Sequence, residues 1–241
     1  MTKLSKLKKP TFDCQLSTLD RLAQKLRPYI PFTALNTVWR KLDKDSKLLL
    51  DVGCGKGEPM RFINRRKRFY AVGVDIFEPY HQESRKSGCY DELILADIRN
   101  PPLKPKSFDI VFAMEVLEHL EKQEGERLLH SMERIVRKQM ILSTPVGKYK
   151  QDPYDGNPSQ EHKHIWNPAT IEKLGYKVSG CGIRNIGGRH GLVARLPKKF
   201  RPLGDMAWVL AGPLARLFPS LAGDMVCSKR LEPQEKKDKG G

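Results

Sequence analysis

Three aspartates, each near the end of a short apolar run, are the residues in this sequence whose types and spacing best support chemistry. Asp51 lies near the end of the run Leu48–Val52, and a turn with alternating glycines at positions 53, 55 and 57 follows it. Asp75 closes a second apolar run about 20 residues beyond the glycines, and Asp97 closes a third. A nucleotide-binding α/β unit uses an acid at that interval to bind ribose hydroxyls. The spacing therefore predicts a ligand that contains a nucleoside.

The glycine turn narrows the choice of ligand. A dinucleotide fingerprint, GxGxxG, needs a third glycine where this chain has Glu58 or, counted from Gly55, Met60. Glu58 would also repel a pyrophosphate at the start of the next helix. A glycine turn preceded by an acid suits a ligand with adenosine, no phosphate and a cationic end. S-adenosylmethionine is such a ligand.

Each part of this ligand has a predicted partner. The glycines let the backbone approach the ligand closely. Asp75 is expected to bind the ribose hydroxyls and Asp97 to accept a hydrogen bond from the adenine amino group, while Asp51 is the candidate partner of the α-ammonium group. These contacts require the three acids to lie at one edge of one sheet.

The elements that would bring the acids together alternate along the chain. Apolar runs predict strands over residues 48–52, 70–76, 92–96, 108–113, 139–144, 176–181 and 224–230. Helical periodicity predicts helices near residues 17–26, 34–42, 58–65, 79–86, 125–138 and 168–174, and a further helical stretch opens at 115–120. Strands that alternate with helices predict a parallel, right-handed, doubly wound sheet, in which ligands bind at the carboxyl ends of the strands.

The segments LLLDVGCGKG, VGVDI, LADI and FDIVFAMEVLEHL resemble class I S-adenosylmethionine-dependent methyltransferases over about residues 45–145. The EVLEH stretch is similar to the ubiquinone-biosynthesis type and its small-molecule relatives. The resemblance implies an α/β, doubly wound, mostly parallel, seven-stranded Rossmann-like sheet with an antiparallel last strand. It assigns cofactor-binding residues to the methionine end (Asp51, Gly53, Gly55), the ribose (Asp75, Ile76), the adenine (Asp97, Ile98) and the neighbourhood of the transferred methyl (Glu115).

Methyl transfer requires few catalytic groups. Methyl transfer from a sulfonium is an in-line displacement, so positioning and desolvation supply much of the barrier reduction, and only a protonated nucleophile needs a base. His164 and His119 are the predicted bases because they follow the fifth and fourth strands, at the correct edge; His190 ranks below them. No metal is expected, since His162 and His164 form a pair without a third ligand in view.

Composition and charge guide the division of the rest of the chain into segments. We expect residues 1–44 to form a tail and cap helices, 45–231 the methyltransferase domain, and 232–241 a charged tail. The 241 residues carry a net charge of +16, which favours anionic partners. The five cysteines are scattered, without CxxC pairs or a secretory signal before them, and this favours a cytoplasmic location.

An insertion over residues 184–223 replaces the short hairpin expected before the last strand. It holds seven basic residues against Asp205, and its middle, Met206–Ala215, is apolar and includes Trp208. Ten residues are too few to cross a bilayer, which needs about 20. Three interpretations stay open: a helix on a membrane surface, a lid over a hydrophobic substrate, and a helical hairpin packed on the sheet.

These observations predict methyl transfer to an oxygen or nitrogen of a small or lipid-like acceptor, with an anionic acceptor and a peripheral membrane location included in the hypothesis. The alternatives are an RNA methyltransferase and a catalytically silent, cofactor-binding partner of another protein. The run Asn100–Leu103 differs from the NPPY motif of amino-group methyltransferases, because it follows the third strand and lacks the stacking aromatic. A cytosine-C5 enzyme lacks its cysteine here, and a metal-dependent O-methyltransferase lacks its cluster of acids.

Overall fold

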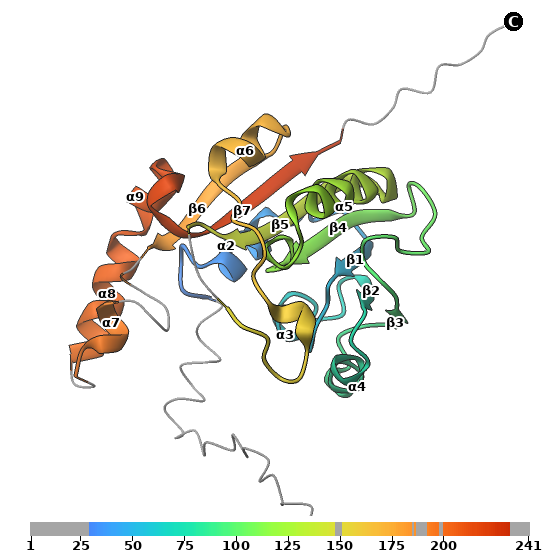
Figure 1. The fold of residues 1–241 in the computed structure, drawn as a ribbon, viewed down its shortest axis with the longest axis horizontal. Helices are drawn as coiled ribbons and strands as arrows, with labels where there is room; N and C mark the ends of the chain where they lie inside the picture. Colours follow the sequence, from blue (N-terminus) through green and yellow to red (C-terminus); the bar gives the residue numbers. More distant parts are fainter. Residues whose placement is uncertain (1–28, 148–150, 185, 187–191, 198–199, 232–241) are drawn as a thin grey trace, which may run out of the picture.

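A seven-stranded sheet organises the computed structural model, which describes residues 29–147, 151–184, 186, 192–197 and 200–231 (Figure 1). The strands are β1 (Leu48–Val52), β2 (Tyr70–Asp75), β3 (Glu92–Leu95), β4 (Phe108–Met114), β5 (Val136–Pro145), β6 (Lys177–Ile183) and β7 (Ala222–Arg230). Their order is β3-β2-β1-β4-β5-β7-β6. The first five are parallel, and β7 runs antiparallel to both β5 and β6. The predicted fold class is confirmed.

Helices cover both faces of the sheet, because the central strands are apolar on both sides. On one face, α5 (Lys122–Ile135) and α6 (Pro168–Lys173) pack against strand residues such as Leu50 and Val111. On the other face, α2 (Ala34–Lys41) and α3 (Glu58–Ile63) pack against their neighbours Leu49 and Ile110. The remaining crossover helix, α4 (Glu78–Ser87), packs beside β2 and β3. Figure 1 shows α5 in front of β4 and β5.

Local signals account for several helix ends. Asn167 caps α6 by accepting a hydrogen bond from the Thr170 amide, and Pro168 occupies the first turn, as the sequence predicts. The predicted helix at residues 17–26 lies outside the described residues.

Two predicted boundaries are wrong. The helix expected over 125–138 runs from Lys122 to Ile135, and Val136 instead opens β5, where it pairs with Phe108. An apolar β-branched residue at this point suits a helix face and a buried strand equally, so periodicity extends the helix too far. The stretch at 115–120 contains a single 3-10 turn, Leu117–His119, rather than the opening of a longer helix.

Residues 192–197 and 200–221 form what we call the helical arm. It contains α7 (Leu192–Arg195), α8 (Arg201–Leu210), α9 (Gly212–Leu217) and a 3-10 turn at Pro219–Leu221. Figure 1 shows α7 and α8 projecting from the sheet beyond β6. The arm joins the sheet through α9. The backbone of α9 packs so closely on β6 that a Cβ added at Gly180 would lie 2.0 Å from the carbonyl oxygen of Ala215. Trp208 packs its indole over Gly182, so it anchors α8 and is only partly exposed.

Candidate functional site

The glycine turn after β1 has three glycines in the left-handed region, with φ values of 71°, 49° and 74° at Gly53, Gly55 and Gly57. A Cβ at Gly53 would lie 2.6 Å from a methyl of Val116, and one at Gly57 would lie 2.9 Å from the Tyr90 ring. At Gly55 no such contact is closer than 4.0 Å. Gly53 and Gly57 therefore let the turn pack against the protein, and Gly55 is the position that leaves open space for a ligand.

Asp75 stands at the end of β2 and faces this turn. Its Oδ2 accepts a hydrogen bond of 2.8 Å from the Gly55 amide, and its Oδ1 accepts one of 2.9 Å from the Phe77 amide. Each carboxylate oxygen keeps acceptor capacity for a further donor, so a pair of hydroxyl groups can bind there. Ile76, the next residue, leaves 49% of its surface exposed beside the carboxylate. This arrangement suits the predicted ribose contact.

Asp51 is almost completely buried, with 2% of its surface exposed. The hydroxyl of Tyr90 donates a hydrogen bond of 2.6 Å to its Oδ2. Burial raises the pKa of Asp51 to about 7 and the negative charge of Asp75 adds to that rise, while the Tyr90 hydrogen bond opposes it. Sequence reasoning missed Tyr90, which precedes β3 and carries no local signal for this contact.

Asp97 lies after β3, at the expected edge, but it has a partner that the sequence did not indicate. The Nε of Arg99 donates to both carboxylate oxygens, at 3.0 and 2.9 Å, and another nitrogen of the same guanidinium lies 2.8 Å from Glu124. These bonds hold the pKa of Asp97 below its usual value. Ile98 packs its partly buried side chain on the core. An adenine amino group would therefore meet an ionised carboxylate that Arg99 orients.

Glu115 and Glu118 form a second carboxyl cluster where β4 ends. Glu115 adopts a φ of +54°, a strained value for a residue with a side chain, and its Oε1 accepts a hydrogen bond of 2.6 Å from the Ser143 hydroxyl. Burial raises the pKa of Glu115 to about 8, with the neighbouring Glu118 adding to the rise, although solvent still reaches the residue. The end of β4 therefore carries two neighbouring carboxyl groups with raised pKa values.

The two predicted bases, His119 and His164, make different contacts. His119 lies with its ring centroid 5.0 Å from that of His162, and burial lowers its pKa, so it is neutral at pH 7 and able to accept a proton. His164 instead places its ring edge-on to Trp166, with centroids 5.0 Å apart. The structure thus groups His119 with His162 and Glu118, while His190 lies outside the described residues.

Comparisons with known proteins agree with this geometry. Residues 50–143 match the family model described as a methyltransferase domain. A mouse protein, the probable tRNA methyltransferase 9B, is 27% identical over 94 residues, which are 39% of this chain and 20% of the mouse protein. The chain therefore matches about a fifth of the length of that relative.

Solved structures share the fold over most of the chain. A complex between the Haloferax volcanii Trm112 methyltransferase activator and a methyltransferase superposes with a TM-score of 0.57 at 14% identity, covering 88% of this chain and 93% of that chain. A SAM-dependent methyltransferase from Archaeoglobus fulgidus gives 0.52 at 19% identity, covering 88% and 94%. Residues 50–143 thus match a methyltransferase domain, and the chain shares the fold of these solved structures.

Proposed function

We propose that this chain transfers a methyl group from S-adenosylmethionine to an oxygen or nitrogen of a small, lipid-like acceptor at an anionic membrane surface. The cofactor would bind at the carboxyl ends of β1, β2 and β3, with Asp51, Asp75 and Asp97 on its three parts. The methyl group would point toward Glu115 and His119 at the end of β4. His119, neutral at pH 7, would accept the proton of an acceptor that must lose one.

The helical arm is the observation that supports this acceptor class. Its large apolar side chains are exposed: Leu203 59%, Met206 56%, Leu210 72%, Leu214 53%, Leu217 72% and Phe218 56%. Those of α8 recur three and four residues apart and so share one side of the helix. A contiguous exposed apolar patch on a protein surface marks an interaction site.

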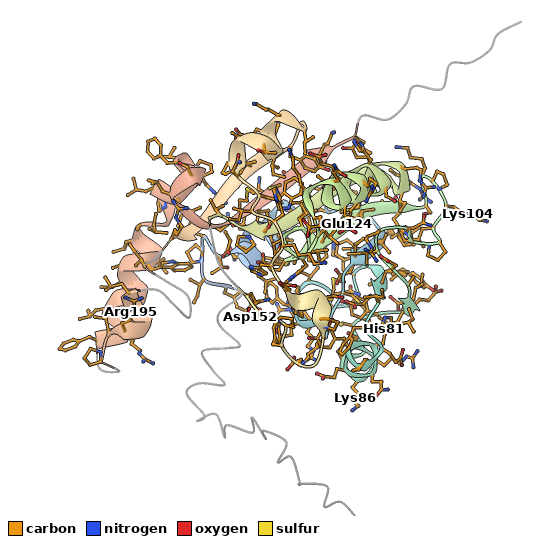
Figure 2. All side chains as sticks on the ribbon, in the orientation of Figure 1. His81, Lys86, Lys104, Glu124, Asp152 and Arg195 are labelled. Atoms are coloured by element: carbon orange, nitrogen blue, oxygen red, sulfur yellow. The ribbon has the colours of Figure 1, made fainter. Side chains whose placement is uncertain are left out.

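Basic residues give the arm its preference for anionic surfaces. Arg201 and Arg216 of α8 and α9 are exposed, and so is Arg195, which Figure 2 shows on the projecting end of the arm. Exposed apolar side chains next to arginines match a helix that lies in the interface of an anionic bilayer. None of the helices in the described ranges has the length and apolar composition needed to cross a membrane.

The points where the arm leaves and rejoins the sheet support its assignment to the acceptor side. Ile183, at the end of β6, pairs with Ala222 at the start of β7, and Pro145, at the end of β5, pairs with Asp224. The arm therefore leaves and rejoins the sheet at the same edge where the parallel strands end. The similarity of EVLEH to the ubiquinone-biosynthesis type supports a small-molecule acceptor.

RNA is the second candidate acceptor. The similarity to a tRNA methyltransferase and the net charge of +16 favour it, because Lys and Arg side chains bind phosphates without regard to sequence. RNA binding gives no reason for the apolar exposure of the arm, which is why the lipid-like acceptor ranks first.

Vesicle sedimentation tests the proposal. The full chain should sediment with vesicles that contain anionic phospholipid and stay in solution with zwitterionic ones. Replacement of Leu210 and Leu217 by Ser should weaken vesicle binding at least tenfold, whereas Leu95→Ser, which changes a residue 54% exposed on β3, should not. Salt-sensitive RNA binding in a gel shift, without affinity for anionic vesicles, would contradict the lipid proposal.

A further inference from the structure

We propose that Glu118, His119 and His162 bind a divalent metal ion of the Zn²⁺ type at the end of β4. One ligand atom from each of these side chains lies within 4.8 Å of the other two. A catalytic zinc site uses three protein ligands of this kind, two imidazoles and a carboxylate, and leaves a position open for water or substrate. Small side-chain rotations bring such atoms to coordination distances of about 2.1 Å.

Glu118 has an oxygen that lacks a partner. The side chain is buried, with 3% of its surface exposed, and its Oε2 accepts a hydrogen bond of 2.9 Å from the Thr144 hydroxyl. Its Oε1 is also buried, and no donor from the described residues contacts it. A buried carboxylate oxygen without a donor is costly, and a bound cation would remove that cost.

A proton shared with the neighbouring Glu115 carboxyl is the competing explanation for this oxygen. It would satisfy Oε1 but gives no reason for the imidazoles of His119 and His162 to converge on the same carboxylate. The cluster as a whole, rather than the single oxygen, therefore favours a metal ion.

His119 is held in the orientation that a ligand needs. Its Nδ1 lies 3.1 Å from the carbonyl oxygen of Glu161. Because a carbonyl only accepts, Nδ1 carries the proton and Nε2 keeps its lone pair. Metal-binding histidines commonly have their second ring nitrogen fixed in this way by a carbonyl or carboxylate.

The backbone holds His162 close to the same carboxylate. The amide of Lys163 donates a hydrogen bond of 2.7 Å to the carbonyl oxygen of Glu118, and the amide of His164 donates one of 3.2 Å. The amide of His162 itself bonds to the carbonyl oxygen of Gln151 at 3.1 Å. Two segments about 40 residues apart are thus fastened together where their side chains meet, so the cluster is part of the fold.

The donor set indicates which ion fits. Two imidazoles and one carboxylate suit Zn²⁺, Co²⁺ or a similar transition metal, whereas Mg²⁺ and Ca²⁺ prefer oxygen ligands. With the ion bound, Nε2 of His119 is a ligand and no longer a base. If the proposed function holds, the ion would take over that role by lowering the pKa of an acceptor hydroxyl at the open position. The metal site itself does not depend on that function.

Zn²⁺ titration of the full chain tests the site without cofactor or acceptor, so its result is independent of methyl transfer. After chelator treatment, calorimetry should show one tight Zn²⁺ site per chain. His162→Ala and Glu118→Gln should each weaken it at least tenfold. His130→Ala, which removes an exposed imidazole of α5 (side chain 77% exposed), should leave it unchanged.

A second readout identifies the ligands. Co²⁺ bound to the wild-type chain should give visible absorption of a low-symmetry nitrogen and oxygen site without thiolate charge transfer, and His162→Ala should lose it. His162 is only partly buried, so thermal unfolding of that variant should match the wild type. A wild-type chain that binds no stoichiometric Zn²⁺, or variants that bind as tightly as the wild type, would overturn the proposal.

Discussion

The raised pKa of Asp51 predicts that S-adenosylmethionine binds this chain in a pH-dependent way. Asp51 is buried and its pKa is raised to about 7, while the proposed contact to the α-ammonium group of S-adenosylmethionine needs the ionised carboxylate. Below pH 7 the free protein holds a proton that the bound cofactor must displace. The affinity should therefore rise with pH up to about 7.

The size of the effect follows from the ionised fraction. With a pKa of about 7, roughly 3% of Asp51 is ionised at pH 5.5 and about half at pH 7.0. The affinity should thus increase about 15-fold over this interval, which corresponds to about 1.6 kcal/mol. Tyr90→Phe removes the hydrogen bond that stabilises the carboxylate, so it should shift the curve to higher pH.

Isothermal titration calorimetry in pairs of buffers with different ionisation enthalpies counts the protons directly. Nearly one proton should leave the wild-type protein on binding at pH 5.5, and about half a proton at pH 7.0. Asp51→Asn should bind more weakly and without this proton release. Equal proton counts in the wild type and Asp51→Asn would show that the titrating group is another residue and would contradict this prediction.

Three further predictions concern the scaffold of the site. The pKa of Asp51 is about 7 in the folded state and 3.8 in the free side chain, so the folded state binds more protons between these values and the free energy of unfolding falls as pH rises from 4 to 7. In urea denaturation at pH 8, Asp51→Asn should therefore be more stable than the wild type, by on the order of 4 kcal/mol at most. Equal stability would contradict this prediction. In the same assay, Gly125→Ala should lower the free energy of unfolding by about 1–2 kcal/mol despite the better helix propensity of Ala, because the new Cβ would lie 2.5 Å from the buried Trp166 ring. A rise of about 1 kcal/mol would show that the ring moves away freely. Asn64→Ala should lower the melting temperature and reduce the free energy of unfolding by about 3 kcal/mol, because the side-chain amide of Asn64 is 1% exposed and makes three hydrogen bonds to backbone groups. A reduction below about 1 kcal/mol would mean that water replaces these hydrogen bonds.

The sequence predicted the sheet and the location of its acids because those signals are local. An apolar run that ends in an acid, and glycines that must adopt positive φ, mark Asp51, Asp75 and Asp97 without any knowledge of the fold. The parallel topology then places them at one edge, since consecutive parallel strands share a direction.

The partners of these acids could not be predicted, because they come from contacts between distant segments. Tyr90 is 39 positions from Asp51, and Glu124 meets Arg99 across 25 positions. The pairing of Glu118 with His162 likewise depends on how the loop after β5 folds back. Such contacts are decided by tertiary packing and leave no periodic pattern in the sequence.

Transfer of a labelled methyl group from S-adenosylmethionine shows whether the chain methylates a lipid-like acceptor. The full chain would be incubated with labelled cofactor and a cell extract, and the label would be followed separately into the organic-solvent and RNA fractions. We expect label in the organic fraction that disappears with Asp75→Ala and persists with Asp91→Asn, a change at the opposite end of the sheet. Label confined to RNA, or no transfer by the wild-type chain, would contradict it.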